Sequence, residues 1–213
     1  KIHSLDTKEI LKSKYYKRLV FDELFAHFLL SSKIRTKIKK IKKSQKIFKD
    51  CKENLIKNLN FKLTNDQELA IRIINEDLKS KSRMFRLLQG DVGSGKTIVS
   101  MIAAVNSINA GYQASFMVPT EILAKQHFSF ASKYLPKNIK IQILTGKSKF
   151  AERKKILEDL KNGNIDFLIG THSLFQKKVE YKKLGLIIID EQHKFGVRQR
   201  KELSEKGGNN CDV

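Results

Sequence analysis

One short segment, Gly90 to Thr97, has the residue types and spacing to hold the phosphates of a nucleotide. It reads Gly-Asp-Val-Gly-Ser-Gly-Lys-Thr and satisfies the phosphate-loop pattern G-x-x-x-x-G-K-[ST] in full. Its glycines let the backbone curl so that successive N–H groups point at an anion, and a following helix adds the positive end of its dipole. Lys96 would reach the β- and γ-phosphates of ATP, and the Thr97 hydroxyl would ligate Mg²⁺. The nucleotide-binding residues predicted here are Gly90, Asp91, Val92, Gly93, Ser94, Gly95, Lys96 and Thr97.

Two adjacent carboxylates, Asp190 and Glu191, have the chemistry to complete this site. They follow the apolar run Leu184–Ile189, which has the length of a buried strand. Asp190 would hold Mg²⁺ directly or through water, and Glu191 would orient and deprotonate the attacking water. Such a pair is commonplace by itself, but after a complete phosphate loop it indicates ATP hydrolysis. We therefore expect Lys96, Asp190 and Glu191 to carry catalysis.

The residues around the two motifs resemble those of the RecG family of superfamily 2 DNA helicases. Asp190-Glu191-Gln192-His193, followed by Phe195-Gly196-Val197, resembles the family's DEQH box and its sequel, and Arg86–Gln89 before the phosphate loop is also similar. The resemblance implies that Gln192 and His193 couple the ATP site to a second lobe. A further segment, Phe61–Gln67, resembles the one that contacts adenine in related helicases, which implies nucleotide contacts by Phe61 and Gln67.

Three more segments resemble the DNA-contacting motifs of these helicases, namely Val118–His127, Thr145-Gly146 and Gly170–His172. The resemblance implies contacts to the DNA backbone rather than to base edges. Thr120, Thr171 and His172 could instead serve only as strand-to-helix caps. His127 is interpreted as a surface or packing residue. The DNA-binding residues predicted from these motifs are Pro119, Thr120, Thr145, Gly146, Thr171 and His172.

Alternating strands and helices must position these motifs. Short apolar runs of strand length occur at Phe85–Gln89, Ala114–Val118, Ile139–Leu144, Asp166–Ile169 and Leu184–Ile189. Helical stretches between them include Thr97–Ile108, Glu121–Tyr134 and Phe150–Lys161. This alternation predicts an α/β fold with a parallel sheet covered by helices on both faces. The resemblance to the helicases implies that this is a RecA-like P-loop NTPase sheet. Ligands of such sheets bind at the carboxyl ends of the strands, where the motifs fall.

Residues 1–60 predict helices and no strand. The segment Arg18–Leu24 resembles the connector that follows the RecG wedge domain, and the apolar residues of Leu19–Leu30 predicted to be buried include Phe21, Leu24, Phe25 and Phe28. The stretch Lys33–Lys49 holds nine basic residues and no acidic one. Its apolar stripe at helical spacing comprises Ile34, Ile38, Ile41 and Phe48. A solvated basic face is the default interpretation, and direct DNA contact is the alternative. We expect a helical linker over 1–60 and the first RecA-like ATP-binding domain over 61–213, truncated at its C-terminal end.

The composition bounds the partners and the setting. The 213 residues include 43 Lys+Arg against 22 Asp+Glu, a net charge of +21. This excess favours a polyanionic partner such as DNA, although codon bias in an AT-rich genome is an alternative. No apolar run approaches the roughly 20 residues of a membrane span. Cys51 and Cys211 have no metal or disulfide spacing, so a reducing, cytoplasmic setting is expected.

The resemblance implies an ATP-dependent DNA helicase or translocase that acts, with Mg²⁺, on branched duplex DNA during fork reversal, Holliday junction branch migration, recombination and repair. It implies a monomer in which a wedge domain and a second RecA-like lobe, with an arginine finger, lie outside this sequence. The chain alone is therefore expected to be inactive, and marginal in stability because the strand after the Asp-Glu pair is absent. Two alternatives stay open: a non-catalytic nucleotide- or DNA-binding remnant of a split gene, and the translocase module of a transcription-repair coupling factor, which usually has Asp-Glu-Glu-His here.

Overall fold

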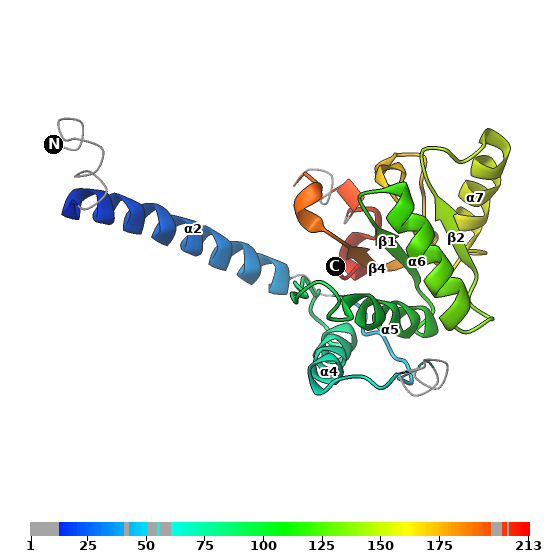
Figure 1. The fold of residues 1–213 in the computed structure, drawn as a ribbon, viewed down its shortest axis with the longest axis horizontal. Coiled ribbons are helices and arrows are strands. Elements are labelled where there is room, and N and C mark those ends of the chain that lie inside the picture. Colours follow the sequence, from blue (N-terminus) through cyan, green and yellow to red (C-terminus); the bar gives the residue numbers. More distant parts are fainter. Residues whose placement is uncertain (1–12, 41–42, 51–54, 56–60, 197–201, 204) are drawn as a thin grey trace. The chain divides into compact units, whose positions relative to one another are not determined.

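The chain divides into two compact units at residue 40. The computed structural model describes residues 13–40, 43–50, 55, 61–196, 202–203 and 205–213, and Figure 1 shows their fold. Ile41, Cys51 and Val197 lie outside the described residues, as do the side chains of Ile34 and Ile38. No described helix combines the length and the apolar character that crossing a bilayer needs.

The first unit contains one long helix, α2 (Lys14–Lys40). Within it Arg18 and Asp22 form an ion pair one turn apart at 3.0 Å, and the rings of Phe21 and Phe25 stack with centroids 5.8 Å apart. The prediction of a helix is confirmed, but the predicted burial of its apolar residues is wrong. Their exposed fractions are about half or more, reaching 67% for Phe28. Helical spacing predicts which residues share a stripe, whereas burial depends on a second element that packs against it.

The second unit contains, in its described part, one sheet of four parallel strands in the order β2-β3-β1-β4. The strands are β1 (Gln113–Met117), β2 (Ile141–Leu144), β3 (Phe167–Gly170) and β4 (Leu184–Ile189). Each overlaps a predicted strand and differs from it by at most two residues at either end. Met117 pairs with Gly170 on one side and with Ile189 on the other, so the carboxyl ends of three strands meet at one edge.

Helices cover both faces of this sheet, which confirms the predicted α/β architecture (Figure 1). They are α4 (Asn65–Lys79), α5 (Lys96–Asn109), α6 (Glu121–Tyr134) and α7 (Phe150–Asn162). Residues of α4, α5 and α6 pack with Phe116 and Phe167 in one core cluster. Residues of α7 pack with Leu168 and Ile187 in the other. Alternate residues of the strands face the two layers, as the pleat of a strand dictates.

The strand predicted at Phe85–Gln89 is wrong for the described structure, in which this segment has no regular secondary structure. A strand is held by main-chain hydrogen bonds to a neighbour. Here Val213 supplies the neighbouring backbone: the Arg86 amide donates to the Val213 carbonyl at 2.9 Å, and the Val213 amide donates to that of Met84 at 3.1 Å. Asp212 in turn pairs with β4. The segment after the Asp-Glu pair thus begins to insert between β4 and the residues that lead to the phosphate loop.

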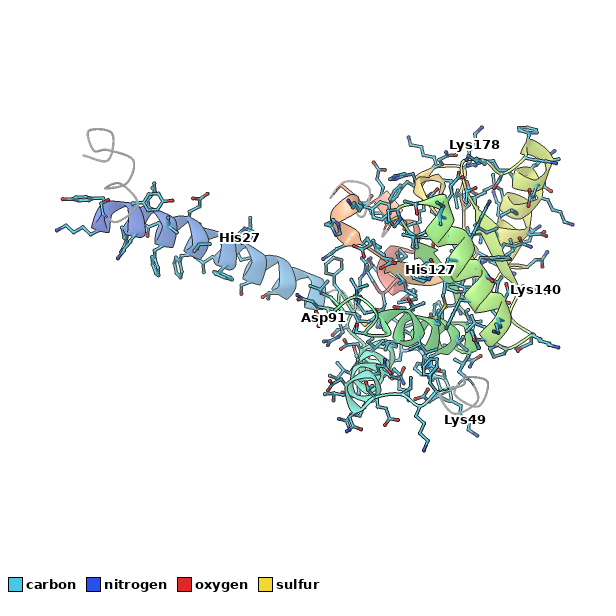
Figure 2. All side chains as sticks on the ribbon, viewed as in Figure 1. His27, Lys49, Asp91, His127, Lys140 and Lys178 are labelled. Atoms are coloured by element: carbon cyan, nitrogen blue, oxygen red, sulfur yellow. The ribbon has the colours of Figure 1, made fainter. Side chains whose placement is uncertain are left out.

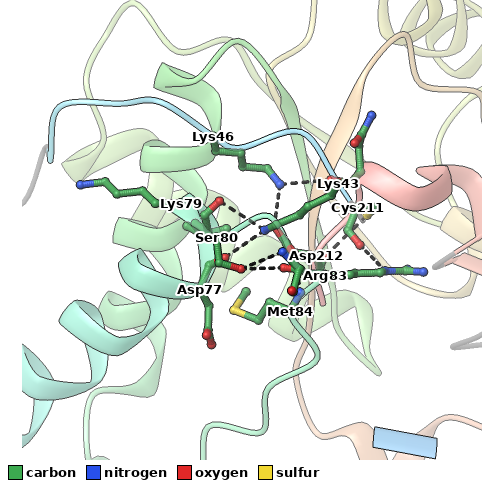
Figure 3. Close-up of polar contacts among 12 residues, drawn as sticks. Lys43, Lys46, Asp77, Lys79, Ser80, Arg83, Met84, Cys211 and Asp212 are labelled. Atoms are coloured by element: carbon green, nitrogen blue, oxygen red, sulfur yellow. Dashed lines mark hydrogen bonds and ion pairs between the residues drawn. The ribbon is translucent and has the colours of Figure 1, made fainter. Parts of the chain in front are cut away.

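Two lysines of the basic stretch are buried, so the interpretation of that stretch as a solvated face is wrong at Lys43 and Lys46. Helix α2 ends at Lys40, and residues 43–50, which belong to the second unit, form no helix. The two ammonium groups share one carboxylate oxygen of Asp212, at 2.5 and 2.6 Å (Figure 3). Burial lowers the pKa of Lys43, and its hydrogen bond to Asp212 opposes this. Phe48, predicted to lie on a helix, packs instead against the core.

Candidate nucleotide and DNA site

The phosphate loop joins the Met84–Arg86 segment to the start of α5. Gly93 and Gly95 have φ angles of 82° and 79°, in the left-handed region that side chains other than glycine rarely adopt. Lys96 opens the helix, and its Nζ donates to the carbonyls of Gly90 at 2.8 Å and Asp91 at 2.7 Å. The ammonium group therefore lies inside the curve of the loop, where the loop's amides and the helix dipole favour an anion.

Gln67 links the predicted adenine segment to this loop. It is the third residue of α4 and forms a capping box with Thr64. Its Nε2 donates to the Ser94 carbonyl at 2.9 Å. A Cβ atom on Gly95 would collide with the same Gln67 amide, so close packing and a positive φ both require glycine there. Phe61, half exposed, precedes this helix.

The two carboxylates stand directly beyond the carboxyl end of β4. The Asp190 amide still donates to the Met117 carbonyl of β1 at 2.9 Å, which anchors its backbone to the sheet. The imidazole of His127 beside Asp190 lowers the pKa of this carboxyl, Lys96 adds to the effect, and burial opposes it. Glu191 then turns sharply, with φ 49° and ψ 52°, and its amide donates to Asp190 Oδ1 at 3.0 Å.

His127 lies closer to Asp190 than its sequence context indicates. It sits on α6 and is only 7% exposed, which excludes the surface interpretation, while the packing interpretation holds (Figure 2). Its ring packs on Phe116 with centroids 4.8 Å apart. Its Nε2 lies 3.4 Å from Asp190 Oδ2. The sequence contains a signal for the burial of His127, because this residue shares helical spacing with Ala124 and Ala131, which also face inward. That spacing does not predict that Asp190 is its neighbour.

The oxygen donors of the site suit magnesium. Thr97, the second residue of α5, offers a hydroxyl, and Asp190 offers a carboxylate that its surroundings hold in the ionised form. Mg²⁺ prefers such oxygen ligands and takes only one or two from a protein, the others being phosphate and water. The residues present therefore fit a magnesium nucleotide.

The residues assigned to coupling form the short 3-10 helix η3 (Gln192–Lys194). His193 is exposed, and its Nδ1 lies 3.4 Å from Glu191 Oε2. The next residue, Phe195, is buried and its ring meets that of His172 edge-on, with centroids 5.3 Å apart. The structure thus brings the segment after the Asp190-Glu191 pair into contact with a predicted DNA-binding residue.

The predicted DNA-binding residues follow the carboxyl ends of β1, β2 and β3. Four of the six line one shallow cavity of about 360 Å³, namely Pro119, Gly146, Thr171 and His172. Of the other two, Thr145 is buried, and Thr120 caps α6 by accepting from the Leu123 amide at 3.2 Å. Thr120 thus caps a helix, whereas Thr171 makes no side-chain cap hydrogen bond to the 3-10 helix His172–Phe175 that follows it. The cavity also contains Glu121, whose carboxylate lies 3.5 Å from the ammonium of Lys147.

Comparison with known proteins accounts for this arrangement. Residues 64–211 match the DEAD/DEAH box helicase family. The chain belongs to this family. Its match runs from the capping threonine of α4 to the segment beyond the Asp-Glu pair, so one helicase domain contains the phosphate loop, the carboxylates and the predicted DNA-binding edge.

The resemblance to RecG is also confirmed. The chain is 48% identical to the ATP-dependent DNA helicase RecG of Aquifex aeolicus over 91% of its length, and 43% identical to that of Borreliella burgdorferi over 97%. It spans 25% and 30% of those two proteins. The structure of RecG bound to a three-way DNA junction superposes with a TM-score of 0.77 at 40% identity, covering 91% of this chain and 30% of that one. A hypothetical ATP-dependent RNA helicase from Sulfolobus tokodaii, 20% identical with a TM-score of 0.56, shares the fold.

Proposed function

We propose that the protein is an ATP-driven DNA translocase that remodels branched duplex DNA, by fork reversal and Holliday junction branch migration, in recombination and repair. The observation that carries the proposal is the gathering of Lys96, Asp190 and Glu191 at one edge of the sheet, in a chain homologous to RecG along most of its length. The RecG that superposes on this chain is itself bound to a three-way DNA junction. RecG similarity favours this function over a transcription-repair coupling factor.

In the proposed site the chain's own residues bind and position the nucleotide. Lys96 exchanges its two loop carbonyls for the β- and γ-phosphates, while Gln67 and Phe61 hold adenine beside the loop. Thr97 and Asp190 hold Mg²⁺, which supplies positive charge against the phosphates when it is bound. Glu191 orients the attacking water and accepts its proton. Glu191 is exposed, so water can reach it.

The wider organisation of the protein is part of the proposal. Residues 61–213 would be the first RecA-like domain and residues 1–60 a helical linker. A wedge domain and a second RecA-like lobe of the same protein would complete the motor, since the chain spans only 25–30% of its RecG relatives. We propose a cytoplasmic monomer. The alternative, a non-catalytic remnant, predicts no ATP turnover, whereas the translocase predicts turnover.

The test is ATP turnover by the full-length protein with and without a three-way DNA junction. We expect the junction to stimulate turnover, and Lys96→Ala to abolish calorimetric binding of Mg-ATP while the thermal unfolding midpoint is retained. Equal binding by wild type and Lys96→Ala would refute the nucleotide site. Binding without junction-stimulated turnover would support the remnant and remove the DNA proposal alone.

A further inference from the structure

The proposed mechanism does not use His127, yet the buried Nε2 atom of this residue points at Asp190, the carboxylate proposed to bind the metal. His127 Nε2 has no hydrogen-bond partner among the residues that the structure describes, although it is shielded from water. Leaving such a group unpaired costs about 1–3 kcal/mol. The nearest acid is Asp190, whose Oδ2 lies 3.4 Å away. This distance is long for an N–H···O hydrogen bond, and contacts of this kind tighten when an active site binds its ligands.

The two oxygens of Asp190 have different surroundings. Oδ1 accepts from the amide of Glu191 at 3.0 Å, and Oδ2 faces His127. A donor on each oxygen would keep the carboxylate plane from rotating freely and would still leave each oxygen a lone pair for a metal or its water. Outer-shell donors of this kind orient metal ligands in proteins.

The fold fixes His127 as firmly as the carboxylate. Its ring packs on Phe116 of β1, and β1 pairs with β4, the strand that ends next to Asp190. Ala124 and Ala131 are fully buried on either side of it along α6, so the helix cannot shift easily. The imidazole is therefore held by the sheet through Phe116 and by the packing of its own helix, with its Nε2 directed at Asp190 Oδ2.

We propose that His127 is a positioning residue that donates from Nε2 to Asp190 Oδ2 and so sets the carboxylate for Mg²⁺. The inference rests on the proposed function, since it concerns the metal of the same nucleotide site. Its role is to orient a ligand and not to contact the nucleotide. The prediction is a loss of magnesium-dependent affinity with the affinity for metal-free nucleotide unchanged.

The test measures ADP binding by calorimetry on the full-length protein, once in EDTA and once across a Mg²⁺ titration. His127→Phe keeps an aromatic ring on Phe116 but removes the donor. His127→Gln places an amide Nε2 near the position of the imidazole Nε2. We expect His127→Phe to bind ADP in EDTA like wild type, but to need about 10–100-fold more Mg²⁺ to reach tight ADP binding. His127→Gln should bring the Mg²⁺ requirement most of the way back to that of the wild type.

A double-mutant cycle with Asp190→Asn separates positioning from packing. If His127 acts through Asp190, adding His127→Phe to Asp190→Asn should not raise the Mg²⁺ concentration needed for tight ADP binding any further. The proposal is overturned if His127→Phe keeps the wild-type Mg²⁺ dependence, or if the Phe and Gln variants lose it equally. Should His127→Phe not fold, His127→Asn, whose amide is too short to reach Asp190, takes its place with the same expectations. A wild type that binds no nucleotide would instead reject the proposed function.

Discussion

Glu191 has an unusual backbone for its residue type, being the only non-glycine residue with positive φ among those the structure describes. A left-handed conformation at a non-glycine residue costs of order 1–3 kcal/mol and persists only where the surroundings enforce it. Here the Glu191 amide donates to Asp190 and its carbonyl accepts from the Lys194 amide at 2.8 Å. The chain therefore leaves the sheet direction directly after Asp190, the proposed metal ligand, and the turn presents the Glu191 side chain to solvent.

This geometry leads to a prediction for Glu191→Gln. The amide keeps the size of the side chain but cannot accept a proton, so nucleotide affinity should be unchanged while turnover falls by about 10²–10⁴-fold, the usual worth of general-base catalysis. Calorimetry and a steady-state ATPase assay on the full-length protein measure the two quantities. Glu158→Gln, at an exposed position on α7, is the matched control and should change neither. Wild-type turnover by Glu191→Gln would assign the base elsewhere.

At the scale of elements, the extended segment 43–50 is tied to the segment after β4 by the Lys43–Asp212–Lys46 cluster. Asp212 Oδ1 also accepts from the Met84 amide at 2.7 Å, so one carboxylate joins three parts of the chain (Figure 3). Lys46 additionally lies over the Tyr112 ring, 4.9 Å from its centroid. Two ammonium groups without water depend on this acid, because buried charge is tolerated only when paired.

Asp212→Asn should therefore be strongly destabilising. The amide can still accept from Met84 but leaves two buried ammonium groups without their ion-pair partner, and breaking a buried pair in this way costs about 3–5 kcal/mol. Urea unfolding of the full-length protein measures the loss. The control is Glu180→Gln, which removes the exposed ion pair to Lys161 and should leave the midpoint unchanged. An unchanged midpoint for Asp212→Asn would show that the cluster is not a structural tie.

Cys211 gives a local readout of the same element. Burial raises the pKa of its thiol to about 12, so at pH 8 it stays protonated in the folded protein and reacts slowly with alkylating reagents. Unfolding returns the thiol to its ordinary pKa, so labelling reports opening of this segment. Asp212→Asn should accelerate labelling at Cys211, whereas Glu180→Gln should not.

The elements that sequence predicts well are those whose signal is local. Glu121–Tyr134 is predicted with the bounds of α6 and Leu184–Ile189 with those of β4, because a helix cap and an apolar run mark their ends. Phe85–Gln89 fails because a strand needs main-chain pairing along its length, whereas Val213 pairs with this part of the chain only at Met84 and Arg86. Lys46 is misread because its partner, Asp212, is 166 positions away in the sequence.

The site shows the same division. The phosphate loop and the Asp-Glu pair are contiguous motifs, so their residues can be read from the sequence directly. The contact between His127 and Asp190 arises only because β1 and β4 are neighbours in the sheet. No spacing in the sequence encodes that order, so this residue needed the structure.

For the whole molecule, the proposed nucleotide-binding residues and the predicted DNA-binding residues share the carboxyl edge of one sheet. Asp190 directly follows β4, and the predicted DNA cavity follows β1, β2 and β3. Phe195 packs between the two regions, against His172 and Phe175. Because Lys43 and Lys46 are occupied by Asp212, the surplus of +21 overstates the charge free for a phosphate backbone. The position of exposed lysines should therefore decide DNA affinity, and not their number alone.

Two lysines that flank β2 test this idea. Lys147 follows its carboxyl end, next to the cavity residue Gly146, and its side chain is 87% exposed. Lys140 precedes its amino end and is also exposed (Figure 2). If the cavity edge binds duplex DNA, Lys147→Ala should weaken binding and make the log–log salt dependence shallower by about 0.9, the contribution of one phosphate contact. Lys140→Ala removes the same charge at the opposite edge and should leave that slope unchanged.

Fluorescence anisotropy of a labelled junction, titrated at several salt concentrations with the full-length protein, measures both slopes. Equal slopes for the two variants would show that binding follows net charge, and would remove the cavity edge from the proposed DNA interface.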